Sequence, residues 1–168
     1  FYYYQSGAIN ESLSDIWGEF VDQTNGKGND SPGVRWLMGE DIDGGAIRSM
    51  SNPPAFNDPD RMRSGLYTCD VSEQDSGGVH SNSGVLNKAA FLLVDGGSFN
   101  GKTVSALGVN KTAKIMYEMA AYFLPSASDY QVIYDTLQAA CTSLIGKAGI
   151  TASDCQQVKN AVDATEMN

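Results

Sequence analysis

The sequence predicts a mainly α-helical domain that spans residues 1–168. First, apolar residues recur at helical spacing in most of the chain outside residues 25–78. Second, the stretch between, and residues 51–76 above all, is rich in Pro, Gly and Asn and lacks that spacing. Third, the composition is 42% hydrophobic and 18% charged, which is typical of a globular domain. We therefore expect about five helices and one long irregular segment, either as one domain or as part of a larger protein.

The first helix is predicted over residues 7–24. Its two faces differ in chemistry: one side carries the apolar residues Ile9, Leu13, Ile16 and Phe20, and the other carries the acidic residues Glu11, Asp15 and Asp22. By periodicity alone, the acidic side is a solvated helix face. The Gly- and Asn-rich stretch 25–33 ends this helix.

Residues 34–50 are predicted as short extended or irregular pieces. The turn-rich stretch 51–76 follows, with Pro53, Pro54 and Pro59 and little helical period. A long turn-rich segment in a compact domain often lies over a functional surface, although a plain connecting loop is the simpler interpretation.

Four further helices are predicted from residue 79 onward. Residues 79–94 form an apolar run that ends at Gly96-Gly97, and residues 111–124 form an amphipathic helix stopped by Pro125. Ser128 or Asp129 can cap the next helix, which runs to about Ile145. Thr151 or Ser153 can cap the last helix, whose inner face is Cys155, Val158, Ala161 and Val162.

Charge and hydropathy exclude two classes of partner. The net charge of −9 argues against nucleic acid, because phosphate binding needs a basic surface. No run of 18 apolar residues occurs, so no membrane span is expected. The chain opens on Phe1-Tyr2-Tyr3-Tyr4 without an initiator Met or a signal peptide. We therefore expect it to begin at a cut, made by a protease or by design.

Three cysteines occur, at positions 69, 141 and 155. Cys141 and Cys155 can form a disulfide between consecutive helices, with a loop that contributes roughly 3 kcal/mol. Such a bond implies an oxidising compartment, whereas two buried thiols would suit a reducing one. Cys69 then remains free or pairs with a segment outside this chain.

The single histidine, His80, stands where a Gly-rich turn enters the apolar run. Asp75 can fold back to orient the ring, and a protonated imidazole stabilises developing oxyanion charge; a structural histidine in a turn is the alternative. Arg48 can donate two hydrogen bonds to a carbonyl or carboxylate, although a structural arginine is the simpler interpretation. The sequence has no His-Glu-x-x-His and no Gly-x-Ser-x-Gly, so it contains no complete active site.

Several motifs occur together in a familiar order: Ser6-Gly-Ala-Ile-Asn-Glu-Ser-Leu-Ser-Asp-Ile-Trp-Gly, Gly39-Glu-Asp-Ile, Ile47-Arg-Ser-Met, Asp58-Pro-Asp and Gly77-Gly-Val-His-Ser-Asn-Ser-Gly. In these motifs the chain resembles, over nearly its whole length, the C-terminal half of thermolysin-like zinc metallopeptidases. The resemblance implies the helical C-terminal domain of that fold.

The resemblance also implies roles for residues in the matching motifs. Glu11 matches the third zinc ligand, and Asp15 matches the carboxylate that orients a zinc-bound histidine. His80 matches the histidine that stabilises the transition state of peptide hydrolysis, and Asp75 matches its carboxylate partner.

Three more residues match substrate-contacting positions of the family. Arg48 matches the arginine that holds a substrate backbone carbonyl. Ile47 matches the lining of the pocket for the side chain after the scissile bond, where bulky apolar residues are favoured. Tyr2 aligns with a tyrosine that helps hold the oxyanion.

Calcium is the second metal that the resemblance implies. Asp22 and Glu40 match two calcium-binding carboxylates, but Arg35 and Leu37 stand where two-calcium members carry further acidic ligands. We therefore expect at most one calcium ion, with ligands from the part of the protein absent here.

The function implied is part of a secreted zinc metalloendopeptidase that cleaves peptide bonds on the N-terminal side of bulky apolar residues. The two histidines and the general-base glutamate of His-Glu-x-x-His would come from the N-terminal half, so we expect the chain alone to be inactive and to bind zinc poorly. Its partners would be peptide substrates and that missing half. The alternatives are a non-catalytic helical binding module and an isolated autolytic fragment.

Overall fold

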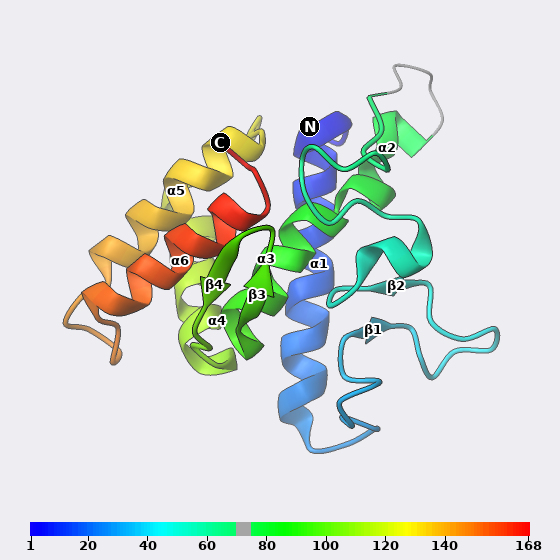
Figure 1. Ribbon diagram of the computed structural model, residues 1–168, viewed down its shortest axis with the longest axis horizontal. Coiled ribbons are helices and arrows are strands. Elements are labelled where there is room, and N and C mark those ends of the chain that lie inside the picture. The colour runs from blue at the N-terminus through cyan, green and yellow to red at the C-terminus, as the bar shows by residue number, and fades with distance from the viewer. Residues whose placement is uncertain (70–74) are drawn as a thin grey trace.

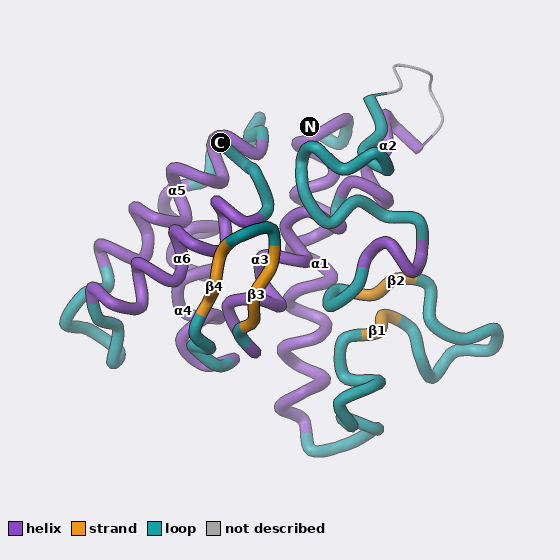
Figure 2. The backbone as a smooth tube through the Cα atoms, viewed as in Figure 1, coloured by secondary structure: helices purple, strands orange, loops and turns teal. Residues whose placement is uncertain are grey.

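The computed structural model describes residues 1–69 and 75–168 (Figure 1). The long helix α1 (Tyr4–Asn25) lies between two unlike parts of the molecule. On one side of it is a group of helices, and on the other is the segment 26–69, which is mostly loop (Figure 2). The mainly α-helical class predicted from the sequence is confirmed, and α1 agrees with the predicted helix 7–24 within three residues at its start.

The irregular segment contains little regular structure. Strands β1 (Leu37–Met38) and β2 (Arg48–Ser49) form an antiparallel pair, and Pro53–Phe56 forms one turn of 3₁₀-helix, η1. Pro53 and Pro54 open that turn, where their missing N–H groups need no partner. The prediction of short extended and turn-rich pieces is confirmed for the described residues of this segment.

The predicted single helix 79–94 is divided in the structure. Helix α2 (Asp75–Asn82) precedes α3 (Gly84–Asp95), and Ser83 between them keeps right-handed helical backbone angles. The true break lies earlier, at Ser76, Gly77 and Gly78, whose φ angles of 49°, 84° and 80° are left-handed. The prediction of a helix over 79–94 that follows a Gly-rich turn therefore agrees with the backbone, and it missed only the division into α2 and α3 at Ser83.

A β-hairpin follows α3 and was not predicted. Strands β3 (Gly97–Phe99) and β4 (Lys102–Val104) pair in antiparallel register around Asn100-Gly101. Both turn residues have positive φ, 47° and 75°. The Asn-Gly dipeptide is the common sequence signal for this turn, and it could have identified the hairpin.

The remaining helices agree with the predicted ranges. Helix α4 (Val109–Glu118) passes into a π-helical turn, η2 (Met119–Phe123), before Pro125. Helix α5 (Tyr130–Ser143) is capped by the Asp129 side chain, and α6 (Ala152–Ala164) by a capping box of Thr151 and Asp154. The structure thus selects Asp129 and Thr151 from the alternative caps.

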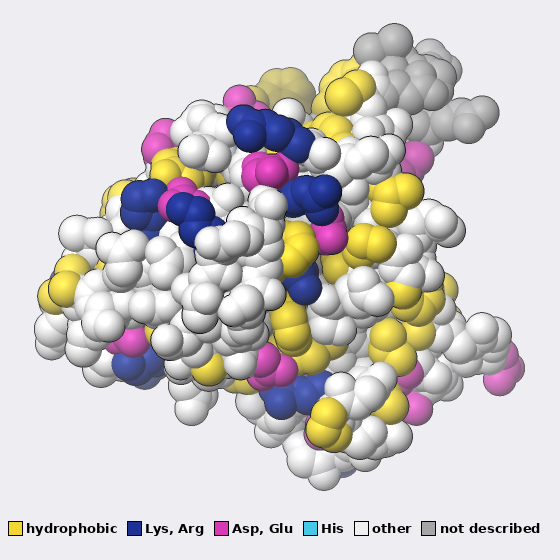
Figure 3. All heavy atoms as spheres, in the orientation of Figure 1, with side chains coloured by type: hydrophobic (Ala, Val, Ile, Leu, Met, Phe, Trp, Pro, Cys, Tyr) yellow, Lys and Arg dark blue, Asp and Glu magenta, His cyan; other side chains and the backbone are white. Residues whose placement is uncertain are grey.

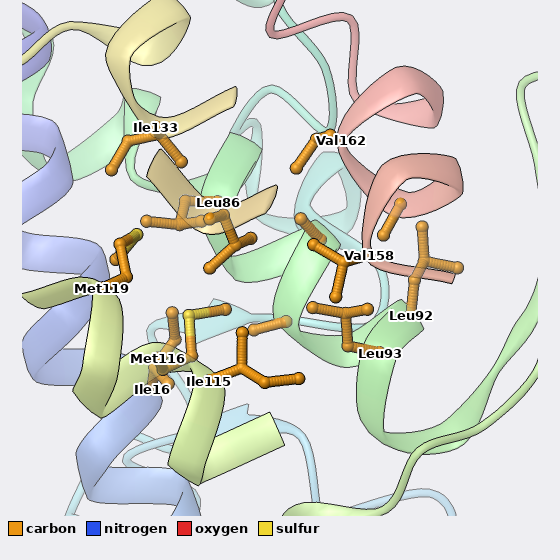
Figure 4. Close-up of a cluster of buried hydrophobic side chains, with 14 of the residues drawn as sticks. Ile16, Leu86, Leu92, Leu93, Ile115, Met116, Met119, Ile133, Val158 and Val162 are labelled. Atoms are coloured by element: carbon orange, nitrogen blue, oxygen red, sulfur yellow. The ribbon is translucent and has the colours of Figure 1, made fainter. Parts of the chain in front are cut away.

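The core lies between α1, α3, α4, α5 and α6 (Figure 4). Its fully buried side chains include Ile16, Leu86, Leu93, Ile115, Met116, Met119, Ile133, Val158 and Val162. The predicted disulfide Cys141–Cys155 is present and joins α5 to α6, and Cys69 is an exposed free cysteine. Among the described residues, no helix has the length and apolar composition needed to cross a membrane.

Candidate active site

Helix α1 presents Glu11 to two groups from other parts of the chain. The Tyr2 hydroxyl donates a hydrogen bond to Glu11 Oε1, and His80 Nε2 lies 3.5 Å from Glu11 Oε2. Tyr2 Oη is also 3.4 Å from His80 Nε2. The structure therefore brings together three residues that are up to 78 positions apart in the sequence, as the expected roles require.

The second nitrogen of His80 faces Asp75. Asp75 Oδ1 pairs with His80 Nδ1, and the His80 backbone N–H donates to Asp75 Oδ2 at 3.1 Å. This fold-back depends on the left-handed residues between them. A Cβ on Gly77 would lie 2.3 Å from Tyr4 Cδ1, so both the φ of +84° and the close approach of Tyr4 require glycine there.

Arg48 lies on the same side of α1 and pairs with Asp15. Arg48 Nε donates to Asp15 Oδ2 at 2.9 Å and Nη2 donates to Oδ1 at 2.8 Å, a bidentate arrangement. Asp15 is buried, with 4% of its surface exposed, so this is a largely desolvated ion pair. The adjacent Ile47 is 55% exposed and approaches Gly39.

The electrostatic environment of this cluster shifts several pKa values. The hydrogen bond to Glu11 is the main cause that raises the pKa of Tyr2 to about 12. Burial alone would lower the pKa of Arg48, but its hydrogen bonds to Asp15 and the nearby carboxylates outweigh burial and raise it. Burial raises the pKa of Asp58 to about 7, although the positive charge of Arg48 opposes this shift.

The residues matched to calcium ligands lie elsewhere on α1. Asp22 is about 16 Å along the helix axis from Glu11, at 1.5 Å per residue. Its Oδ1 accepts a hydrogen bond from Asn25 Nδ2 at 3.3 Å. Burial, together with the charges of Glu40 and Asp22, raises the pKa of nearby Glu19 to about 8, so the three carboxyl groups interact.

Arg35 occupies this second region as well. Its Nη2 donates to Gln23 Oε1 at 2.8 Å and lies 3.1 Å from Asp95 Oδ1. Arg35 thus pairs with Asp95, and not with Asp22 or Glu40, in the contacts of the described residues. The described residues do not fit a complete calcium site, since no group of three His, Cys, Asp or Glu side chains among them could hold a metal ion.

The same observation bears on zinc. Glu11 offers a carboxylate oxygen of the kind that zinc accepts, but the described part of the chain adds no two further ligands beside it. In the described part of the chain, Glu11 therefore fits a zinc site as a single ligand only.

Three residues near these clusters were missed by sequence reasoning: Glu19, Asp58 and Asn87. Asn87 is the clearest case, because it is a polar residue inside the apolar run 85–94 and is 1% exposed in the structure. A polar residue at a core position was the signal that could have identified it.

The family model of the thermolysin metallopeptidase α-helical domain matches residues 1–167. The chain belongs to this family. A zinc metalloproteinase of Renibacterium salmoninarum is 42% identical to it over 166 residues, which are 95% of this chain and 30% of that relative. A bacillolysin of Brevibacillus brevis is 41% identical, and a thermolysin of Alicyclobacillus acidocaldarius subsp. acidocaldarius is 40% identical; each match covers 97% of this chain and 29% of the relative.

The chain thus spans about three tenths of the length of these relatives. Membership of the family accounts for the helical fold and for the order of the motifs.

Proposed function

We propose that residues 1–168 form the C-terminal helical part of a secreted zinc metalloendopeptidase. The main support for this proposal is that four side chains are close together in the fold: Tyr2, Glu11, Asp75 and His80. Two of them come from the N-terminal 11 residues and the other two from α2. A surface helix with a solvated acidic face would not need this arrangement.

In the proposed reaction, each residue has a limited task. Glu11 supplies one zinc ligand. Bound zinc would polarise the peptide carbonyl and lower the pKa of a water molecule. Asp75 pairs with His80 Nδ1 and orients the ring, so that Nε2 faces the position where it would donate a hydrogen bond to the developing oxyanion. The Tyr2 hydroxyl lies 3.4 Å from that nitrogen and donates its one hydrogen to Glu11 here; with Glu11 bound to zinc, it would donate to the same oxyanion instead.

Substrate binding is assigned to the Arg48 strand. The guanidinium group uses Nε and one Nη2 hydrogen for Asp15, which leaves donors for a substrate backbone carbonyl. Ile47, being largely exposed, is available to line a pocket for a bulky apolar side chain after the scissile bond. Asp15 would in addition accept a hydrogen bond from a zinc-bound histidine of the N-terminal half.

Calcium ligands and a secreted location are also part of the proposal. Asp22 and Glu40 are proposed as two ligands of at most one calcium ion, with the others from the N-terminal half. The disulfide favours an oxidising compartment, which agrees with secretion. Lys and Arg lie beside Asp and Glu on the face shown in Figure 3, so this face offers no continuous basic surface for nucleic acid.

The rest of the longer protein is the proposed macromolecular partner. An apolar groove of about 440 Å³ lies beside α1 and is lined by Trp17, Ala113, Lys114, Tyr117, Glu118, Leu144 and Ala148. Tyr117 in it is 58% exposed and adjoins other apolar side chains of the groove, and a contiguous exposed apolar patch is typical of an interface. A helical binding module would use the same groove, so activity must decide between the two functions.

The test uses the full-length protein. We expect it to bind zinc and to hydrolyse peptides before Leu or Phe. Glu11→Gln should lose most of the zinc and the activity, whereas Asp135→Asn, at an exposed carboxylate on α5, should change neither. His80→Ala should retain zinc and lower kcat by about 10²–10³-fold.

Two outcomes would contradict the proposal. Full activity of the Glu11→Gln protein would remove Glu11 from the metal site. Peptidase activity in a pure sample of the 168-residue chain would show that no other segment is needed.

A further inference from the structure

Asn87 is a buried polar residue in the first turn of α3, surrounded by core side chains. Because it is 1% exposed, its amide must find hydrogen-bond partners within the protein or destabilise the fold. Its backbone N–H bonds to the Ser83 carbonyl as part of the helix. The side chain is therefore free to serve another element.

Both ends of the Asn87 amide contact α1. Nδ2 lies 2.8 Å from Asp15 Oδ2, and Oδ1 lies 2.6 Å from Ser12 Oγ. A carboxylate can only accept hydrogen bonds, so the NH₂ group of the Asn87 amide faces Asp15. The Ser12 hydroxyl must then donate its hydrogen bond to Asn87 Oδ1. Ser12 is itself fully buried, so the hydroxyl fixes the orientation of the amide.

These bonds continue to the substrate side of α1. Helix α1 lies between α3 and β2 (Figure 1). Asn87 reaches Asp15 from α3, and Arg48 reaches the same carboxylate from β2. Asp15 Oδ2 accepts from both, so the position of the carboxylate, and with it the plane of the guanidinium group, depends on Asn87.

We propose that Asn87 is a positioning residue that sets the orientation of Arg48 toward the substrate carbonyl, through Asp15. This inference rests on the proposed function. Without the Asn87 amide, the carboxylate would lose one of its three hydrogen bonds and could rotate, and the guanidinium group would turn with it. Arg48 would then hold the substrate carbonyl less well, which weakens substrate binding and leaves the zinc side of the site unchanged.

The experiment measures KM and kcat of full-length Asn87→Leu and Ser12→Ala proteins with an apolar peptide substrate. We expect KM to rise about tenfold for Asn87→Leu and a few-fold for Ser12→Ala, while kcat and zinc content stay within about twofold. The inhibition constant of an uncleaved peptide analogue should rise by the same factors. Ser12→Ala removes one hydroxyl only, so it tests the inference even if Asn87→Leu does not fold.

A double-mutant cycle separates positioning from general destabilisation. In an Arg48→Lys background, where the bidentate geometry is already lost, the Asn87 and Ser12 substitutions should raise KM no further. Thr112→Val is the matched control: it removes a fully buried hydroxyl from α4 whose hydrogen bond goes to the Gly108 carbonyl, not to Asp15, and it should leave KM unchanged.

Three results would overturn the inference. These are an unchanged KM in Ser12→Ala and Asn87→Leu, an equal rise of KM in the Arg48→Lys background, or the same rise in Thr112→Val. If the unsubstituted full-length protein shows no zinc-dependent hydrolysis, the proposed function itself fails, which is a different result from an active protein with an unchanged KM.

Discussion

Removal of the Cys141–Cys155 disulfide tests how much of the stability of the helical group depends on a covalent link. The bond joins α5 to α6 across a sequence separation of 14 residues. A closed loop of that size restricts the unfolded chain by about 3 kcal/mol. For a domain of this length, each kcal/mol corresponds to about 2–4 °C in Tm, so reduction should lower Tm by about 6–12 °C.

The assay is thermal unfolding followed by circular dichroism, with and without dithiothreitol. The Cys141→Ser/Cys155→Ser protein should resemble the reduced protein and no longer respond to dithiothreitol. Cys69→Ser is the matched control, because this exposed cysteine is outside the disulfide and its loss should leave Tm within about 1 °C. A reduced protein with the Tm of the oxidised one would refute the reasoning, since the loop entropy would then be absent.

Three further substitutions test charges and packing, each by urea unfolding. Arg48→Met leaves the buried Asp15 carboxylate without its cation and should lower the free energy of unfolding by about 3–5 kcal/mol. A second substitution, Asp15→Asn, should restore most of that stability. A loss that is not recovered would indicate a packing defect. Glu19 has a native pKa raised to about 8. Between about pH 4.5 and 8 this carboxyl group is therefore ionised in the unfolded protein but protonated in the folded one, so stability falls as the pH rises through this range. Glu19→Gln should therefore add about 1–3 kcal/mol at pH 8 and nothing near pH 4, and the same gain at both pH values would exclude titration as the cause. A Cβ on Gly84 would lie 2.4 Å from the Pro59 carbonyl oxygen, so Gly84→Ala should cost about 1–3 kcal/mol of stability. Gly33→Ala is the control: this glycine has open space around it, and the substitution should change stability by less than about 0.5 kcal/mol. Equal effects of the two substitutions would contradict the steric argument.

Local patterns in the sequence were sufficient for most helices. The spacing of Ile9, Leu13, Ile16 and Phe20 predicted α1, and Pro125 marked the end of the helical segment before α5. These signals succeed because helix formation and termination depend on residues within a turn of one another. The disulfide was predictable for a similar reason, since its cysteines lie on consecutive helices.

Hydrophobic patterns failed for the β-hairpin at 97–104. Its two strands have 3 residues each, too few to show alternation. Periodicity needs several repeats to rise above chance, and these strands do not have them.

The candidate site shows the larger difference between what the sequence determined and what only the folded structure shows. The sequence, through its motifs, determined the family and named Glu11, Asp15, Arg48, Asp75 and His80 as residues to examine. It could not show that Asp15 is buried between Arg48 and Asn87, nor that Glu19 and Asp58 titrate near neutral pH. Those properties arise when α3, α1 and β2 pack together, because burial and charge act between residues that are distant in the chain and adjacent only in the folded protein.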